Sequence, residues 1–294
     1  MVQQGEGISV NESEIRAMID LLDETDSNSI TIIDQKLRDQ GSVVLPFLLD
    51  AIASSITPVK TERLKILIDD IHFQKIKREL QDWTKSEKPD LLEGYLLLST
   101  IGKPELETNQ LRKEVHHLVK DVWLELNDHL TALEKIRVLN HVLYQLKGFE
   151  TQDSKVPESL LLPLLLKSKS GSPLSIGILY LIISQQLSLP VFGVDLPHHF
   201  VLSYLDKNLP QINEKDISYP VMFYINPFNK GIVFTEREVG LFLEQMNLQE
   251  NDNYYNPCDN NSIIKRLINE LKNEYKNLKN KSMEMYLNEL SSVL

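Results

Sequence analysis

Cysteine and histidine, which commonly carry catalysis or bind zinc, are sparse in this chain of 294 residues. It has one cysteine, Cys258, and seven histidines, of which His116-His117 and His198-His199 are adjacent rather than four residues apart. A zinc site needs ligands at spacings that let their side chains converge, and the sequence offers no such spacing. It also has no GxGxxG or GKS/T pattern for binding phosphate groups. We therefore predict no metal and no cofactor.

Two serines lie at the start of an apolar helix, where the helix dipole can act on a nucleophile. Residues 168–183 read SKSGSPLSIGILYLII, and a serine followed by a proline, here Ser172 and Pro173, is a common helix start. Ser175 then falls in the first turn, near the positive end of the helix dipole. That field favours a thiolate far more than an alkoxide, because a serine hydroxyl is much harder to deprotonate. We favour a structural Ser175 over a catalytic one.

The chain that precedes this helix is predicted to be helical. Apolar residues recur at helical spacing between residues 10 and 149. The first two stripes are Ile15, Met18, Ile19 and Leu22, then Ile30, Ile32, Ile33 and Leu37, the second stripe stopping at Gly41. Residues 19–52 resemble one HEAT-type repeat, in which paired helices stack because neither buries its apolar face alone. An irregular helical bundle fits these residues equally well.

A pattern typical of strands begins at residue 190. PVFGVDL, HHFVLSYL and VMFYINPF are short runs of β-branched and aromatic residues bounded by Pro, Gly or Asn, which is typical of strands. TEREVGLFLEQM predicts a helix with Thr235 and Glu238 forming a capping box, and residues 261–292 return to a helical pattern. The predicted fold class is α+β, with an N-terminal helical array, a core holding a small antiparallel sheet, and C-terminal helices.

Composition excludes several classes of partner. The 42 acidic and 31 basic residues leave a formal net charge of −11, which opposes binding to nucleic acid. The longest apolar run, residues 174–183, is well short of the roughly 20 residues that cross a bilayer. The N-terminal residues MVQQGEG lack the features of a signal peptide, and a single cysteine allows no intrachain disulfide. We predict a cytoplasmic protein that binds neither nucleic acid nor membrane.

Three blocks of sequence resemble a known family. LNHVLYQLKGF at 139–149, GSPLSIGILYLIISQQLSLPVFGVDLPHHFVLSY at 171–204 and FYINPFNKG at 223–231 are similar in order and spacing to the SirB-type branch of the transglutaminase-like superfamily, including its bacterial members. The resemblance implies a papain-like core, in which a cysteine at a helix N-terminus is served by a histidine and an acidic or amide residue on neighbouring strands. We predict three regions: a HEAT-like domain at 1–104, this core at 105–250, and a helical extension at 251–294.

The same resemblance assigns one role to each of three positions. The position of the cysteine corresponds to Pro173, and that of the histidine to His199. The residue that orients the histidine corresponds to Asn226, where an aspartate is more usual. His199 has an alternative interpretation as a strand histidine that satisfies buried polar groups, and Asn226 has one as a turn residue before Pro227. Cys258 matches no motif of the family.

These assignments favour a protein without catalytic activity. We predict a transglutaminase-like module that binds a protein or peptide, through the cleft around Pro173, His199 and Asn226 and through the helical array. The alternative is a hydrolase or acyl transferase that uses Ser175 as the nucleophile, His199 as the base and Asn226 to orient it. A core that serves only as a folded spacer is the third possibility.

Overall fold

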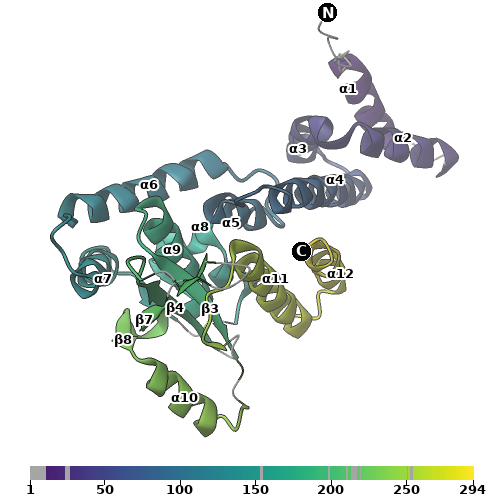
Figure 1. Ribbon diagram of the computed structural model, residues 1–294. Coiled ribbons are helices and arrows are strands. Elements are labelled where there is room, and N and C mark those ends of the chain that lie inside the picture. The colour runs from purple at the N-terminus through teal and green to yellow at the C-terminus, as the bar shows by residue number, and fades with distance from the viewer. Residues whose placement is uncertain are drawn as a thin grey trace, which may run out of the picture. The chain divides into compact units, whose positions relative to one another are not determined.

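The computed structural model describes residues 11–23, 27–152, 155–197, 199–209, 211–212, 217–218, 220–249, 251 and 254–294. Contacts between Cα atoms group the chain into two compact units, one of residues 1–80 with 100–106 and one of residues 81–99 with 107–294. The first unit is helical, and the second combines helices with a small antiparallel sheet (Figure 1). The predicted α+β class is confirmed.

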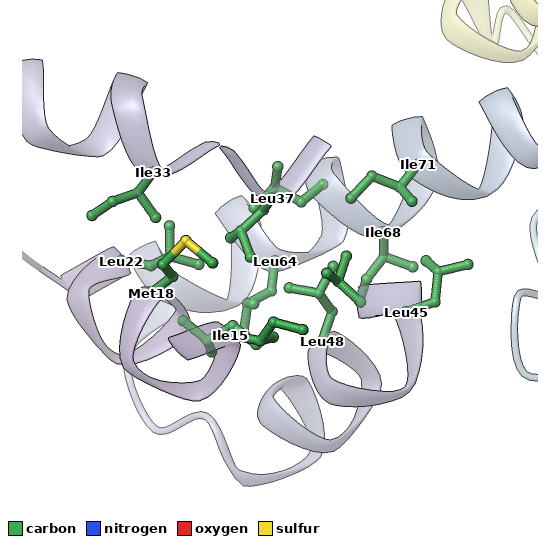
Figure 2. Packing of buried hydrophobic residues seen from close by; sticks show 13 residues of the cluster. Ile15, Met18, Leu22, Ile33, Leu37, Leu45, Leu48, Leu64, Ile68 and Ile71 are labelled. Carbon is green, nitrogen blue, oxygen red and sulfur yellow. The ribbon is translucent and has the colours of Figure 1, made fainter. Parts of the chain in front are cut away.

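In its described residues, the first unit has four α-helices, with short 3-10 turns at Leu21–Asp23 and Gly41–Val44, around one apolar cluster. They are α1 (Glu12–Asp20), α2 (Ser27–Asp39), α3 (Leu45–Ser54) and the greater part of α4 (Pro58–Thr84). Leu22, Leu37, Leu48 and Leu64 are fully buried at its centre, where side chains from all four segments converge (Figure 2). The two predicted stripes supply much of this cluster.

The second stripe contains one residue that faces solvent. Ile33 and Leu37 are buried at a spacing of four residues, which suits one face of a helix. Ile32 is 59% exposed, because its position in the helical period turns it away from that face. Gly41 follows α2 with a φ of +66°, as expected of a residue just past a helix end. The HEAT-type repeat itself stays a prediction.

The second unit holds most of the helices. They are α5 (Leu91–Ser99), α6 (Thr108–Glu125), α7 (Ala132–Asn140), a π-helical turn at His141–Leu146, α8 (Leu162–Ser168), α9 (Pro173–Gln186), α10 (Glu236–Gln245), α11 (Asn260–Asn277) and α12 (Lys281–Ser291). The predicted capping box at the start of α10 is confirmed, since the Glu238 carboxylate accepts the Thr235 backbone N–H at 2.7 Å. None of the helices in the described ranges is both long and apolar enough to cross a bilayer.

The central sheet has four antiparallel strands in the order β3-β4-β7-β8. They are β3 (Val191–Leu196), β4 (His199–Leu205), β7 (Val221–Asn226) and β8 (Ile232–Phe234). The first three are the strands that the sequence predicts, and β8 was not predicted. Two short pairs complete the strands: the parallel β1 (Glu150–Thr151) and β2 (Ser170–Gly171), and the antiparallel β5 (Gln211–Ile212) and β6 (Ile217–Ser218).

Helix α9 packs against this sheet and is buried along most of its length (Figure 1). Every residue from Leu174 to Ser184 is buried, in agreement with an apolar run that has no polar face. Gly177 permits the close approach, because a Cβ atom there would lie 2.7 Å from Cδ1 of Phe200 on β4. The start of α9 is therefore held in a fixed position relative to the strand that carries His199.

The C-terminal helices pack on the same unit as the sheet. Ile264, Ile268 and Leu271 of α11 are fully buried, and α11 contacts α5 and the turn at Pro157–Leu160. The helical tail is broken into α11 and α12, with Leu278 at the break and 56% exposed. The structure thus groups residues 251–294 with the core, and the three-part division into 1–104, 105–250 and 251–294 stays a prediction.

Candidate functional site

Helix α9 begins at a cavity. Ser172 has extended backbone torsions, and its Oγ accepts the backbone N–H of Ser175 at 3.0 Å, so it is the N-cap that the sequence predicts. Pro173 follows at the first helical position, where its missing N–H costs no hydrogen bond. Ser172, Pro173 and Leu174 line a cavity of about 540 Å³ in the second unit.

His199 and Asn226 line the same cavity. His199 is the first residue of β4, lies opposite Leu196 in the β3–β4 hairpin, and is exposed. Its ring meets the ring of Phe242 on α10 edge to face, with 4.7 Å between centroids. The cavity therefore brings together the three positions to which the family resemblance assigns roles, Pro173, His199 and Asn226.

Asn226 caps a turn with its amide oxygen. It ends β7, and its Oδ1 accepts the backbone N–H groups of Phe228 at 3.0 Å and Asn229 at 3.3 Å. Its carbonyl oxygen accepts the N–H of Gly231 at 2.9 Å. The interpretation of Asn226 as a turn residue is confirmed. Its amide oxygen is already engaged by two donors, which is a cost to any role that needs this oxygen to orient a histidine.

Ser175 points away from the cavity into the core. It has no exposed surface, and its Oγ donates to the carbonyl oxygen of Ser172 at 2.9 Å and accepts from Ser172 Oγ at 3.3 Å. Its nearest neighbours include Gly171, where a Cβ atom would lie 2.5 Å from Ser175 Oγ. The residue is not among those that line the cavity. A hydroxyl in this setting has no path to a substrate without movement of the helix start.

A buried polar network holds the turn after Asn226. Asn140 Nδ2 donates to the carbonyl oxygen of Gly231 at 2.8 Å, and the Tyr180 hydroxyl donates to Asn140 Oδ1 at 3.0 Å. The Tyr144 hydroxyl donates to the carbonyl oxygen of Pro227 at 3.2 Å. Burial raises the pKa of both tyrosines, so they remain neutral donors. The network joins the three sequence blocks, because its members come from 139–149, 171–204 and 223–231.

A further part of the cavity wall comes from α11, which was not predicted to belong to the site. Four polar side chains line it from this helix: Arg266, Glu270, Asn273 and Glu274. Three of them repeat every fourth residue, so they lie along one face of the helix. The sequence contains this charged stripe but does not show which surface it faces.

Charge on this wall is arranged around one guanidinium. Arg266 Nη1 donates to Asp195 Oδ1 and, at 3.1 Å, to the carbonyl oxygen of Leu196, while its Nε donates to Glu270 Oε1 at 3.2 Å. Its Cζ atom lies 5.5 Å from the centroid of the Phe200 ring. Burial raises the pKa of Glu270 despite the opposing effect of Arg266, and the carboxylates of Asp195 and Glu274 add to the rise.

Cys258 lies outside the cavity lining, beside β3. Its backbone N–H donates to the carbonyl oxygen of Gly193 at 2.8 Å. Burial raises the pKa of its thiol to about 12, and the nearby carboxylates of Asp195 and Asp259 contribute. No group of three or more His, Cys, Asp or Glu side chains that could hold a metal ion occurs among the described residues.

Fold and cavity together define the class of this protein. A helix begins at a cavity that it shares with the first residue of one antiparallel strand and the last residue of the next, as the resemblance implies for a transglutaminase-like core. The profile described as the transglutaminase-like superfamily matches residues 109–269, more than half of the chain. The chain belongs to this superfamily, and the match extends into α11.

Similar proteins include SirB1 and UPF0162 proteins, in agreement with the resemblance to the SirB-type branch. A UPF0162 protein of Pseudomonas aeruginosa is 29% identical over 122 residues, which are 41% of this chain and 45% of that protein. Protein SirB1 of Salmonella typhimurium is 26% identical over 216 residues, 71% of this chain and 74% of SirB1. A UPF0162 protein of Buchnera aphidicola from Schizaphis graminum is 24% identical over 208 residues, 68% of this chain and 71% of that protein. This chain thus spans less than half of the Pseudomonas relative. No solved structure matches it significantly.

Proposed function

We propose that this protein is a non-catalytic transglutaminase-like module that binds a segment of another protein in the cavity around Pro173, His199 and Asn226. The observation that carries this proposal is that the cavity has a proline where the family resemblance expects the nucleophile. A proline has neither a nucleophilic side chain nor a backbone N–H to offer. The only thiol, that of Cys258, lies outside the cavity lining.

Size and composition of the cavity fit a peptide side chain or a short segment. About 540 Å³ lies within the usual range for ligand sites. Its lining mixes apolar surface from Leu160, Leu174 and Phe228 with amides and charges. Phe228 is 53% exposed at this site, and partly exposed aromatic side chains are frequent anchors in protein interfaces. The helical array of the first unit is a second proposed contact surface.

Panning of a random peptide library against the intact chain tests this function. Selected peptides are expected to bind wild type and to lose affinity about tenfold or more for Phe228→Ala, because the aromatic anchor of the site is removed. Met222→Ala is the matched control, since Met222 is 51% exposed on β7 and is not among the cavity-lining residues. Absence of selected peptides, or equal effects of the two substitutions, contradicts the proposal.

The hydrolase or acyl-transferase alternative has a separate test. A fluorophosphonate probe is expected to leave Ser175 unlabelled, because its hydroxyl is fully buried and donates to the Ser172 carbonyl oxygen. Labelling is followed by mass spectrometry of the digested protein. Labelling of wild type that disappears in Ser175→Ala would support catalysis by Ser175, and loss of that labelling in His199→Ala would assign the base.

A further inference from the structure

The cavity wall contributed by α11 carries an excess of negative charge. Its described lining residues include two carboxylates, Glu270 and Glu274, and one guanidinium, that of Arg266. Arg266 is already shared between Glu270 and a third carboxylate, that of Asp195. The lining itself thus carries two negative charges and one positive charge, and the positive charge is shared with Asp195, which is not among the lining residues. The excess negative charge lies on the part of the wall formed by Glu270 and Glu274, which are one helical turn apart.

One oxygen on this wall is buried without a hydrogen-bond donor. Glu274 Oε2 has less than 1 Å² of exposed surface, and no partner for it is found in the part of the chain that the structure describes. Buried carboxylate oxygens normally accept hydrogen bonds, since an unpaired one loses hydration without compensation. A donor bound in the cavity would satisfy this oxygen once the Glu274 side chain turns to expose it. A cationic donor would also reduce the repulsion between Glu270 and Glu274.

Arg266 shows how a cation is held at this wall. Its guanidinium lies over the Phe200 ring and is paired with two carboxylates, and its side chain is only 14% exposed. A guanidinium suits such a place because it stacks on aromatic rings and donates in pairs to carboxylates. Phe228 supplies a further aromatic ring on the cavity lining, and it is half exposed.

We propose that the bound peptide inserts the guanidinium of an arginine side chain into this cavity, with Glu270 and Glu274 as its counter-ions. The inference rests on the proposed peptide-binding function and specifies its ligand. An anionic side chain is disfavoured, because it would meet two carboxylates and an arginine that is already paired. A neutral side chain would leave the charge excess of the wall uncompensated.

Defined peptides and charge-neutral variants test the proposal on the intact chain. The peptide selected by panning is synthesised with arginine at its anchor position and with lysine, glutamine or glutamate there instead, and binding is followed by fluorescence anisotropy. Glu274→Gln keeps the size of the side chain and removes its charge. Glu125→Gln on α6 is the matched control, because it changes the net charge equally at an exposed position that is not among the cavity-lining residues.

We expect the selected peptides to contain arginine. Their affinity for Glu274→Gln should be about tenfold lower than for wild type, because a charge-assisted contact is lost, and their affinity for Glu125→Gln should be unchanged. Replacing the anchor arginine by glutamine should weaken binding to wild type by a similar factor but have little further effect in Glu274→Gln, which a double-mutant cycle measures. Lysine should bind more weakly than arginine. Thermal unfolding of both variants checks that they remain folded.

Other outcomes separate this inference from the function on which it rests. If peptides bind and depend on Phe228 but carry no arginine, or if Glu274→Gln and Glu125→Gln behave alike, the arginine site is wrong and the peptide-binding function stands. Equal binding of lysine and arginine peptides also contradicts the guanidinium assignment. If no peptide depends on Phe228, the proposed function fails and the inference fails with it.

Discussion

Asn226 illustrates how one side chain is divided between folding and the site. Its amide oxygen accepts two backbone N–H groups and so closes the turn that follows β7. A residue that orients a histidine needs a free acceptor for the ring N–H. The turn after β7 already engages the amide oxygen of Asn226, although the residue still lines the cavity. At the scale of single residues, Asn226 thus lines the cavity while its amide oxygen serves the fold.

Cys258 is expected to be chemically inert in the native protein. Its thiol has a pKa raised to about 12 by burial, with Asp195 and Asp259 adding to the rise. Only the thiolate is nucleophilic, and at pH 8 its fraction is about three orders of magnitude below that of an ordinary thiol. Alkylation by iodoacetamide at pH 8, followed by mass spectrometry, should be at least about a hundredfold slower in native than in guanidinium-denatured protein. Comparable rates would show that Cys258 is exposed and reactive.

His72 is expected to make the first unit sensitive to acid. The residue is 5% exposed, and its Nε2 lies 2.9 Å from the carbonyl oxygen of Thr100. Burial lowers its pKa below 6.5, opposed by the Thr100 carbonyl and Glu105 and assisted by Lys75. Just below pH 6.5, His72 is therefore protonated in the unfolded chain but still neutral in the folded chain. The stability that it contributes above this pH is lost as the pH falls towards its folded-state pKa.

Urea unfolding at pH 7.5, 6.5 and 5.5 measures this effect. The difference in unfolding free energy between wild type and His72→Gln should shrink as pH falls, because only wild type carries the buried imidazole. His117→Gln, at an exposed histidine of α6, is the control and should follow wild type across this range. A difference for His72→Gln that is constant with pH would contradict the sign argued here.

At the scale of elements, local patterns predicted most helices and the three longest described strands, β3, β4 and β7. Burial of Ile15, Met18 and Leu22 follows from their helical spacing, and β3, β4 and β7 follow from their β-branched and aromatic runs. β8 was missed because three residues are too few to show a period. The role of α11 was also missed, since its polar stripe has no local sign of where it docks. Contacts such as that of Arg266 with Asp195 join residues that are distant in sequence.

Gly231 is expected to be irreplaceable in the turn after Asn226. Its φ is +73°, and a Cβ atom there would lie 2.0 Å from Asn140 Oδ1. Gly231→Ala therefore adds a clash with the buried network to a strained backbone, and should lower the free energy of unfolding by about 2–4 kcal/mol. Chemical denaturation followed by circular dichroism measures this change.

Gly148→Ala is the matched control for that substitution. Gly148 has a φ of +70° in the same unit, but a Cβ atom there would meet nothing within 4 Å. Only the cost of placing alanine at a positive φ should remain, which lowers the free energy of unfolding by about 1 kcal/mol. If both substitutions cost the same, the contact between Gly231 and Asn140 contributes nothing, and the turn is held by its backbone alone.

At the scale of the whole molecule, the candidate site belongs to the second unit. Each described residue that lines the cavity lies within 107–294. The family resemblance located Pro173, His199 and Asn226 in the sequence, and the fold brought them to one cavity. The charged wall of this cavity could not be predicted from the sequence, because that wall depends on how α11 packs against the β3–β4 hairpin.

The two units are expected to respond separately to core substitutions, because each has its own buried apolar cluster. Leu64→Ala removes a fully buried side chain of α4 in the first unit, and Leu202→Ala one of β4 in the second. Each should cost about 2–5 kcal/mol, the usual range for a large-to-small change in a core. Hydrogen exchange measured by mass spectrometry should show lost protection in α1–α3 for Leu64→Ala and in β3, β4 and β7 for Leu202→Ala. Loss of protection across both units in either variant would mean that they unfold as one cooperative body.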